Sequence, residues 1–456
     1  MSDTIAAIAT GGGVSAIGIV RMSGDGSLAA ADKVFRAAGG VRLCDAEDKR
    51  MYYGELVDSD GALIDLCLCM LSRAPSSYTG EDTVEFHCHG SPVVLSAALL
   101  ALFSHGVRQA LPGEFTRRAF LSGHMDLTQA EAVIDLIEAE TLAAAQNAAG
   151  QLRGAIAVKM DDIYNKLLDI IAHFHAVIDY PDEDIDDFDI RVYLSQLKSI
   201  EAGLCRMLDT HERGMVLRDG IPTAIIGRPN TGKSSLLNAL LGYDRAIVTD
   251  TAGTTRDTIE EKLAVGNILL RLIDTAGLRK SDDAVEKLGV ERSLAAIREA
   301  GLVLLVLDGS EPLGSEDYNA LHSTLHDTPK IAVVNKSDLP AALELCQLDE
   351  LGVSWCMVSA LSGEGLDCLT AKIRDMFPEF DSVASGDVLT NMRQVDAISR
   401  AAAALRLASS ALAAAVTPDA TLSDIEIALA AIGEVTGKTV REDIISRIFE
   451  RFCVGK

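Results

Sequence analysis

The chain is short of positive charge and of aromatic side chains. Its 456 residues carry 41 Lys and Arg against 67 Asp and Glu, a formal net charge of −26, and only 4% are aromatic. Such an acidic protein is a poor candidate for holding a long phosphate backbone unaided. The sparse aromatics do not suggest a stacking surface for single-stranded RNA. A nucleic-acid substrate would need a local basic patch or a partner. Arg117 and Arg118 are one candidate patch, although ordinary surface arginines are an equally good interpretation.

Paired cysteines, a leader segment and long apolar runs are also missing. The nine cysteines form no C-x-x-C pair, and their number is odd. Met1–Thr10 lacks the basic residues of a secretory signal, so we expect reduced thiols in the cytoplasm. The apolar run Leu302–Leu307 is far too short to span a bilayer and is typical of a buried strand. We expect a cytoplasmic protein with no membrane partner and two to four domains.

A phosphate-binding pattern is present without a mismatch. Gly227–Ser234 reads G-R-P-N-T-G-K-S and fits G-x-x-x-x-G-K-[ST]. It follows the apolar run Ile221–Ile226 and precedes the helix-like run Ser235–Leu241, which is the strand–loop–helix context that the pattern requires. Backbone N–H groups and the helix N-terminus attract phosphate oxygens in such loops. We expect Lys233 at the outer phosphates and the Ser234 hydroxyl on Mg²⁺.

Four further segments follow in the order of a guanine-nucleotide domain. Asp274–Gly277 (D-T-A-G) is expected to hold Mg²⁺ through water, and the threonine segment Thr249–Asp257 can complete the Mg²⁺ shell. In Asn335–Asp338 (N-K-S-D), Asp338 can accept two hydrogen bonds from guanine, a donor pair that adenine lacks. Ser359–Leu361 suits a loop beside the base. The residues expected to contact GTP are Asn230, Thr231, Gly232, Lys233, Ser234, Ser235, Thr249, Asp250, Thr251, Ala252, Gly253, Thr254, Thr255, Asp274, Thr275, Ala276, Gly277, Asn335, Lys336, Asp338, Ser359, Ala360 and Leu361.

The hydrolytic machinery departs from the simplest GTPases. Leu278 follows D-T-A-G, where many such enzymes place a glutamine that orients the attacking water. Either hydrolysis is slow or another group acts, and Glu286 and the pair Asp282–Asp283 are the candidates. No arginine near the phosphate loop is an evident arginine finger, the residue that stabilises the charge of the transition state in many GTPases. A monovalent cation can instead meet the charge that develops between the phosphates, and Asn230 offers it a carbonyl oxygen.

Hydrophobic periodicity predicts three domains. The pattern becomes helical near Thr128, which forms a capping-box pattern with Glu131. The apolar seam from Leu152 to Val177 then indicates a long helix that packs within the molecule. We predict an α/β multi-domain protein: a mixed α/β N-terminal domain (1–118), an α-helical domain (119–213 and 381–456), and an α/β nucleotide domain (214–380) inserted into the helical one.

The motifs taken together resemble one family. The phosphate loop and T-D-T-A-G-T-T-R-D at Thr249–Asp257 occur with D-T-A-G-L-R at Asp274–Arg279 and a chain ending F-C-V-G-K at Phe452–Lys456. The N-terminal part adds the segments Ile17–Gly24, Tyr78–Asp82 and Pro112–Phe120. Over the whole chain, this combination resembles the tRNA wobble-uridine modification GTPases of the MnmE (TrmE) family. The resemblance implies a Ras-like GTPase domain inserted in a helical domain.

The resemblance also implies roles for single residues. K⁺ would take the place of an arginine finger, and Glu286 would be the catalytic, water-orienting residue. The N-terminal domain would bind 5-formyl-tetrahydrofolate, and His124 stands there where the family usually has a lysine, although imidazole is mostly neutral at pH 7. The implied ligands are Asn230, Thr249, Thr251 and Thr254 for K⁺, Ser234 and Thr255 for Mg²⁺, and Arg21, Glu85, His124 and Lys456 for folate.

The implied partners are a second copy of the chain, an FAD-dependent subunit of the MnmG (GidA) type, and tRNA. Together they would add a (carboxymethyl)aminomethyl group to C5 of the wobble uridine. Two other functions fit parts of the pattern. A ribosome-assembly GTPase switch would share the nucleotide motifs, but predicts an appended basic RNA-binding domain. A folate-dependent transferase with a vestigial nucleotide domain is disfavoured because every nucleotide motif is intact.

Overall fold

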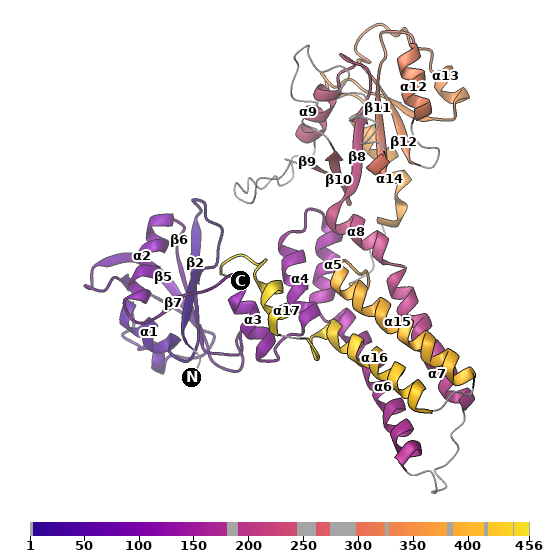
Figure 1. Cartoon of the computed structure of the whole chain (residues 1–456). Helices are drawn as coiled ribbons and strands as arrows, with labels where there is room; N and C mark the ends of the chain where they lie inside the picture. The colour runs from indigo at the N-terminus through magenta and orange to yellow at the C-terminus, as the bar shows by residue number, and fades with distance from the viewer. Residues whose placement is uncertain are drawn as a thin grey trace. The chain divides into compact units, whose positions relative to one another are not determined.

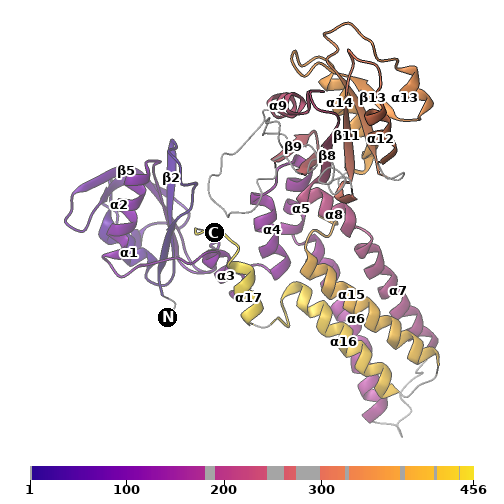
Figure 2. The same cartoon turned by 45° about the horizontal axis from the view of Figure 1, so that its top comes forward.

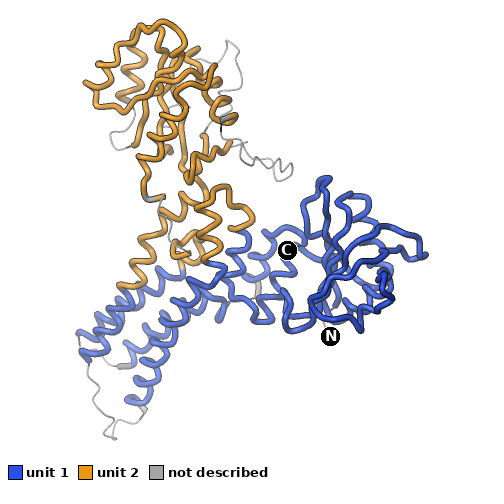
Figure 3. Tube along the Cα trace, turned by 180° about the vertical axis from the view of Figure 1, so that it is seen from behind, with its two compact units in different colours: residues 1–134, 151–201, 397–456 blue, residues 135–150, 202–396 orange. Residues whose placement is uncertain are grey.

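Short apolar runs separated by turns build two β-sheets in the computed structural model. The structure describes residues 3–179, 190–243, 261–273, 298–323, 328–380, 386–414, 418–440 and 442–455. The chain divides into two units, each with one sheet. The first comprises residues 1–134, 151–201 and 397–456, and the second comprises 135–150 and 202–396 (Figure 3).

The sheet of the first unit has seven strands in the order β3-β4-β5-β6-β2-β1-β7 (Figure 1). They are β1 (Ile5–Ile8), β2 (Ile17–Ser23), β3 (Phe35–Ala37), β4 (Met51–Val57), β5 (Leu63–Ser72), β6 (Thr83–His89) and β7 (Arg108–Gln109). Alternate residues of β2, β5 and β6 are buried, because one face packs against α1 (Ser27–Val34) and α2 (Pro92–Phe103). On the other face, Phe115 of α3 (Glu114–Leu121) packs with Ile5 and Ala7 of β1.

Helices complete the first unit. It holds most of α4 (Leu127–Ile137), α7 (Ile190–Leu208) and α15 (Met392–Ala413), and all of α6 (Ala155–Asp179), α16 (Pro418–Thr436) and α17 (Glu442–Phe449). Helices α6 and α16 run side by side (Figures 1 and 2). Met160, Leu167 and Phe174 of α6 are buried, which confirms the predicted intramolecular seam within α6, but Leu152 lies outside this helix and ends α5 (Leu142–Leu152). The helix starts at Ala155 because Gly154, at φ 89°, separates it from α5.

The capping box of α4 lies two residues before the predicted one. Asp126 Oδ1 accepts the N–H of Gln129 at 3.1 Å, and Gln129 Oε1 accepts the N–H of Asp126 at 2.9 Å. Thr128 donates its hydroxyl to the same carboxylate at 2.5 Å. The prediction of Thr128 with Glu131 is wrong, because a carboxylate at Asp126 is a strong acceptor for the first N–H groups of the helix.

The sheet of the second unit has six strands in the order β13-β12-β11-β8-β10-β9. They are β8 (Ile221–Ile226), β9 (Glu261–Val265), β10 (Ile268–Ile273), β11 (Leu302–Asp308), β12 (Lys330–Asn335) and β13 (Ser354–Met357), and only the edge strand β9 is antiparallel to its neighbour. This unit also holds most of α5 (Leu142–Leu152) and all of α8 (His211–Asp219), α9 (Lys233–Tyr243), α12 (Ser315–Ser323), α13 (Cys346–Glu350), α14 (Leu366–Met376) and the 3₁₀ turn η2 (Pro378–Phe380).

Helices cover both faces of this second sheet. Leu304 and Val306 of β11 join the cluster formed with α9 and α14, whereas Val303 and Leu305 join the one formed with α12 and α13. Leu302–Leu307 is fully buried because helices cover both faces of the sheet. Parallel strands in such a position are continuous apolar runs without polar alternation. The expected strand at these residues is confirmed. In such sheets the loops after the carboxyl ends of the strands form the ligand site.

Candidate functional site

The phosphate loop connects β8 to α9 through three residues with positive φ. Gly227, Asn230 and Gly232 have φ values of 149°, 63° and 93°. A Cβ on Gly227 would lie 2.3 Å from the carbonyl oxygen of Val306, so only glycine allows this close approach to β11. Asparagine tolerates the left-handed conformation better than most residues. The predicted loop therefore adopts positive φ angles at two glycines and one asparagine, the residue types that tolerate this conformation.

Lys233 begins α9 and is held by the loop itself. Its Nζ donates to the carbonyl oxygens of Gly227 and Arg228 at 2.8 and 2.7 Å, and the Thr231 hydroxyl also donates to the Arg228 oxygen at 3.0 Å. Burial lowers the pKa of the Lys233 ammonium. A phosphate group at this position would favour its charged form. Ser234 and Ser235 follow in the first turn of α9, and both are exposed.

Asn335 at the end of β12 joins the separate parts of the predicted nucleotide site. Its Nδ2 donates to the carbonyl oxygen of Thr231 at 2.8 Å, and its Oδ1 accepts the N–H of Ala360 at 3.0 Å. A Cβ on Gly232 would lie 2.1 Å from the same Nδ2. The buried side chain of Asn335 thus connects the phosphate loop to the loop Ser359–Leu361.

The carboxylate of Asp338 is oriented by Ser359. Ser359 donates its hydroxyl to Asp338 Oδ1 at 2.6 Å, while Asp338 itself is exposed. Leu361, two residues after Ser359, is 89% exposed. The structure therefore brings Asn335, Asp338, Ser359 and Ala360 together as predicted. A carboxylate with a free face can accept the paired N–H groups of guanine.

Lys336 has a partner that the motif did not reveal. It adopts φ 64°, and its Nζ lies 2.5 Å from Asp308 Oδ2 at the end of β11. Desolvation raises the pKa of Asp308, but hydrogen bonds from Lys336 and Ser310 outweigh it and hold the pKa below its usual range. Asp308 ends an apolar run, and an acidic residue at a strand end is the signal that would have drawn attention to it.

Several predicted site residues lie outside the described residues. These are Thr249, Asp250, Thr251, Ala252, Gly253, Thr254 and Thr255, the segment of Asp274, Thr275, Ala276 and Gly277, the candidate Glu286 with Leu278 and Asp282–Asp283, and Lys456. Their roles stay predictions.

The folate residues predicted in the first unit lie around β2 and β6. Arg21 and Glu85 are cross-strand partners, and Arg21 Nε lies 2.7 Å from Glu85 Oε1. The Arg21 guanidinium also lies 5.5 Å from the centre of the Tyr78 ring. A Cβ on Gly80 would lie 2.6 Å from the His124 ring, so His124 packs against the loop that follows Tyr78. Three of the four predicted contacts thus have described positions.

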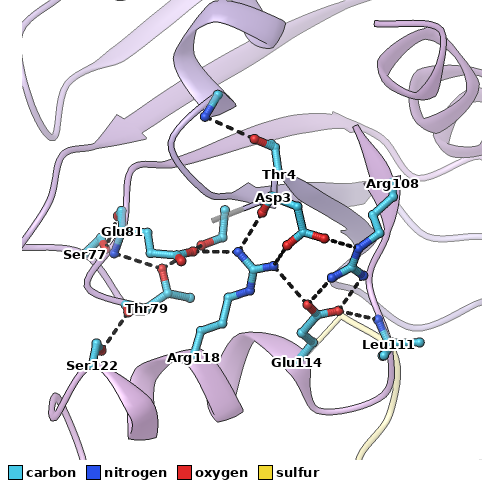
Figure 4. A network of polar contacts seen from close by, with 12 residues as sticks. Asp3, Thr4, Ser77, Thr79, Glu81, Arg108, Leu111, Glu114, Arg118 and Ser122 are labelled. Carbon is cyan, nitrogen blue, oxygen red and sulfur yellow. Dashed lines mark hydrogen bonds and ion pairs between the residues drawn. The ribbon is translucent and has the colours of Figure 1, made fainter. Parts of the chain in front are cut away.

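A polar network holds Glu81, in the loop that follows Tyr78 (Figure 4). Arg118 binds Glu81 at 2.9 Å, Glu114 at 2.9 Å and Asp3 at 2.7 Å, and Arg108 binds Glu114 at 2.6 Å. Arg118 is therefore engaged by three carboxylates and is only 11% exposed. Arg118 fits neither of the two interpretations offered from the sequence, a basic patch or an ordinary surface arginine, because its charge is neutralised within the fold.

The C-terminal segment returns to the N-terminal sheet. Val454 forms an isolated bridge with Pro112, and a Cβ on Gly455 would lie 2.2 Å from the carbonyl oxygen of Ile8. The C-V-G segment therefore contacts β1 and the segment before α3. Within the described ranges, no helix is long and apolar enough to cross a membrane. The same ranges contain no group of three or more His, Cys, Asp or Glu that could hold a metal ion.

Comparisons with known proteins cover the whole chain. The model of the "MnmE helical domain" matches residues 127–453, and that of the "GTP-binding protein TrmE N-terminus" matches residues 4–124. The tRNA modification GTPase MnmE of Latilactobacillus sakei is 42% identical over 458 residues, covering 100% of this chain and 98% of that protein. The same-named protein of Geobacillus kaustophilus is 41% identical over 460 residues, covering 100% and 99%.

Solved structures match only part of the chain. Era of Aquifex aeolicus bound to GDP·AlF4⁻ is 28% identical and covers 41% of this chain and 66% of that one, with a TM-score of 0.26, which is too low to add to the assignment. Because relatives more than 40% identical align along the full length, the chain belongs to the MnmE family of tRNA modification GTPases.

Proposed function

We propose that this protein is a Mg²⁺- and K⁺-dependent GTPase that acts with an FAD-dependent partner of the MnmG type. Together they add a (carboxymethyl)aminomethyl group to C5 of the wobble uridine of certain tRNAs. Family membership supports the tRNA-modification role. The bridge from Asn335 to the phosphate loop and to Ala360 is the observation that carries the nucleotide site, since it joins phosphate and base recognition. Asp338 then selects guanine.

For the metal ions, we propose Ser234 and Thr255 as Mg²⁺ ligands and Asn230, Thr249, Thr251 and Thr254 as K⁺ ligands. Hydroxyl and amide oxygens are donors of the type that such hard cations take. Ser234 and Asn230 are both exposed at the phosphate loop, which supports their part in this set. When bound, the cations would supply positive charge beside the phosphates, while Lys233 supplies the fixed charge of the protein. Glu286 would hold the attacking water.

For the one-carbon cofactor, we propose Arg21, Glu85, His124 and Lys456 as the residues that bind 5-formyl-tetrahydrofolate. The aromatic ring of Tyr78 beside Arg21 fits a flat heterocycle, and Glu85 can accept hydrogen bonds from its ring N–H groups. The return of Val454 to Pro112 supports a role for the C-terminal lysine in the same unit. Isothermal titration with 5-formyl-tetrahydrofolate tests this set, and Glu85→Gln with wild-type affinity would contradict it.

We also propose a homodimer formed through the N-terminal sheet. Met51 and Tyr53 of β4 and Leu66 and Leu68 of β5 are between 39% and 54% exposed on the face away from α1 and α2. A contiguous apolar face of this kind marks an interaction site. Light scattering should show that Leu68→Glu yields monomers, whereas Leu100→Glu on the exposed side of α2 does not. A dimeric Leu68→Glu variant would exclude this face.

The domain organisation and location also remain proposals. We propose a helical domain of 119–213 and 381–456 with the GTPase domain 214–380 inserted in it, and a cytoplasmic protein. The span of the MnmE helical model across residues 127–453 supports an insertion within one family unit. Limited proteolysis should release a fragment close to 214–380, and cleavage only elsewhere would contradict the boundaries.

Steady-state hydrolysis tests the proposed chemistry. GTP turnover should fall sharply when K⁺ is replaced by Na⁺ at equal ionic strength. Glu286→Ala should abolish turnover while GTP affinity stays near the wild-type value, and Asp282→Asn and Asp283→Asn serve as matched controls for the other acidic candidates. Equal rates in K⁺ and Na⁺ would remove the cation from the proposal. Unchanged turnover of Glu286→Ala would remove that residue.

A further inference from the structure

The side chain of Arg228 leaves the phosphate loop and binds α12. Its Nε lies 2.8 Å from Asp317 Oδ1, and its Nη2 lies 3.5 Å from Glu311 Oε2. The Asp317 side chain is only 1% exposed, whereas that of Glu311 is 59% exposed. The pair with Asp317 is therefore the one that solvent and salt screen least. This arginine belongs to the phosphate-binding motif, yet its guanidinium is paired with two carboxylates of the protein itself.

Asp317 is held by the backbone that precedes α12. Its second oxygen, Oδ2, accepts the N–H of Gly314 at 2.9 Å, just before α12 begins at Ser315. Asp317 lies in the first turn of that helix, where a carboxylate is favoured by the helix dipole. Both carboxylate oxygens thus have fixed partners. Arg228 therefore binds a carboxylate whose position is fixed by a second hydrogen bond.

The main chain of the same arginine holds the residues that face the phosphates. The carbonyl oxygen of Arg228 accepts Lys233 Nζ at 2.7 Å and the Thr231 hydroxyl at 3.0 Å. The side chain is therefore fixed to α12, and the carbonyl of that residue fixes Lys233. A shift of Arg228 would displace the ammonium group and the loop hydroxyl together.

We propose that the Arg228–Asp317 ion pair is a positioning device for the phosphate loop. It sets the place of Lys233 at the outer phosphates and has no part in recognition of the base, which is assigned to Asp338. Arg228 and Asp317 are positioning residues, since neither contacts the proposed nucleotide site with its charged group. The proposal rests on the GTPase assignment of the chain and goes beyond it by adding α12 to the machinery of phosphate binding.

The proposal predicts a defined pattern of losses. Asp317→Asn should raise the Kd for GDP and for GTP by about tenfold or more, because the guanidinium loses its buried counter-charge and keeps only the exposed Glu311, and the loop loses its anchor. The preference for GDP over ADP should stay unchanged, because Asp338 and Ser359 are untouched. Glu316→Gln is the matched control, as its carboxylate is exposed on the adjacent residue of the same helix. It should bind like the wild type.

A double-mutant cycle separates positioning from general stability. Arg228→Met, Asp317→Asn and the double variant are measured in the full chain with fluorescent GDP and GTP, alongside the melting temperature of each. If the pair acts as a unit, the double variant should bind no more weakly than either single variant. Arg228→Lys should recover part of the affinity, because it restores a charge opposite Asp317. Single variants that melt earlier but keep both Kd values within about twofold of the wild type would overturn the proposal.

If Asp317→Asn does not fold, Arg228→Met decides the question. Its side chain is 23% exposed, and methionine retains most of the volume without the charge. Weaker GDP and GTP binding with unchanged base preference would support the proposal. A proportional loss of preference for guanine would instead show a general loosening of the site and contradict it.

Discussion

The Asn335 side chain bonds the Thr231 carbonyl oxygen at 2.8 Å, and it does so from the end of a different strand. Because the same amide also accepts the N–H of Ala360 at 3.0 Å, three loops at one edge of the sheet share one buried residue. The loop proposed to bind the phosphates and the loop proposed to contact the base are therefore connected through one side chain.

Asn335→Ala should weaken GDP and GTP binding together. It leaves the Thr231 carbonyl and the Ala360 N–H without this partner, and the free energy of unfolding should fall by about 1–3 kcal/mol. Titration with fluorescent GDP and denaturant unfolding measure the two effects. Asn335→Asp keeps an acceptor for Ala360 but offers no donor to Thr231, so it should lose affinity as well. Wild-type affinity in both variants would show that the bridge has no role in binding.

Gly232→Ala should impair nucleotide binding and stability. At φ 93° an alanine is strained by about 1–3 kcal/mol, and its Cβ would lie 2.1 Å from Asn335 Nδ2. Gly242→Ala in α9 is the control, because nothing lies within 4 Å of its added Cβ and alanine favours a helix by about 1 kcal/mol. Thermal unfolding should therefore move in opposite directions for the two variants. A shift of the same sign would refute this interpretation of the loop.

Asp338→Asn should change the preferred base from guanine to xanthine. In the proposed site the carboxylate would accept two N–H groups of guanine, whereas an amide offers one donor and one acceptor and pairs better with xanthine. Competition of GTP and xanthosine triphosphate against fluorescent GDP measures the change. Ser359→Ala should cause a smaller loss of GTP affinity, because the Asp338 carboxylate stays in place and loses only the hydroxyl that orients it, while the Ser362 N–H loses the same hydroxyl as acceptor. Unchanged GTP preference in Asp338→Asn would place base recognition elsewhere.

The network around Glu114 should make stability depend on pH. Desolvation raises the pKa of Glu114, but the hydrogen bonds from Arg108, the Leu111 N–H and Arg118 outweigh it, so the pKa lies below its ordinary value of 4.5. A lowered pKa stabilises the folded state above the unfolded-state value, and this stabilisation is lost as pH falls through the folded-state value.

Denaturant unfolding between pH 7 and about pH 3 tests the contribution of Glu114. The difference in unfolding free energy between the wild type and Glu114→Gln should be largest near neutral pH and should shrink in acid. Glu47→Gln removes an exposed pair with Arg50 and should change little at any pH. A pH-independent difference for Glu114→Gln would argue against the charged network.

The contiguous motifs were predictable because their chemistry is local. The order of strand, phosphate loop and helix around Gly227–Ser234 follows from residue types at fixed spacing, although α9 begins at Lys233, two residues before the expected run Ser235–Leu241. The buried run Leu302–Leu307 was likewise predictable, because a strand covered on both faces has no polar alternation.

Long-range ion pairs were not predictable in this way. Arg228 and Asp317 are 89 residues apart, and Asp308 and Lys336 are 28 apart, so no local pattern pairs them. Arg118 shows the converse error. Its sequence suggests a surface charge, but folding surrounds it with Asp3, Glu81 and Glu114. The helix start at Asp126 was misplaced because two acceptor side chains of similar type lie two residues apart.

Mass spectrometry of tRNA nucleosides tests the central claim most directly. Nucleosides would be compared between a strain that lacks this gene, the same strain with a wild-type copy, and the strain with the Glu286→Ala copy. The account predicts loss of a C5-substituted wobble uridine in the deletion strain, recovery with the wild-type copy and no recovery with Glu286→Ala. An unchanged nucleoside profile in a strain without a redundant gene would contradict a role in tRNA modification.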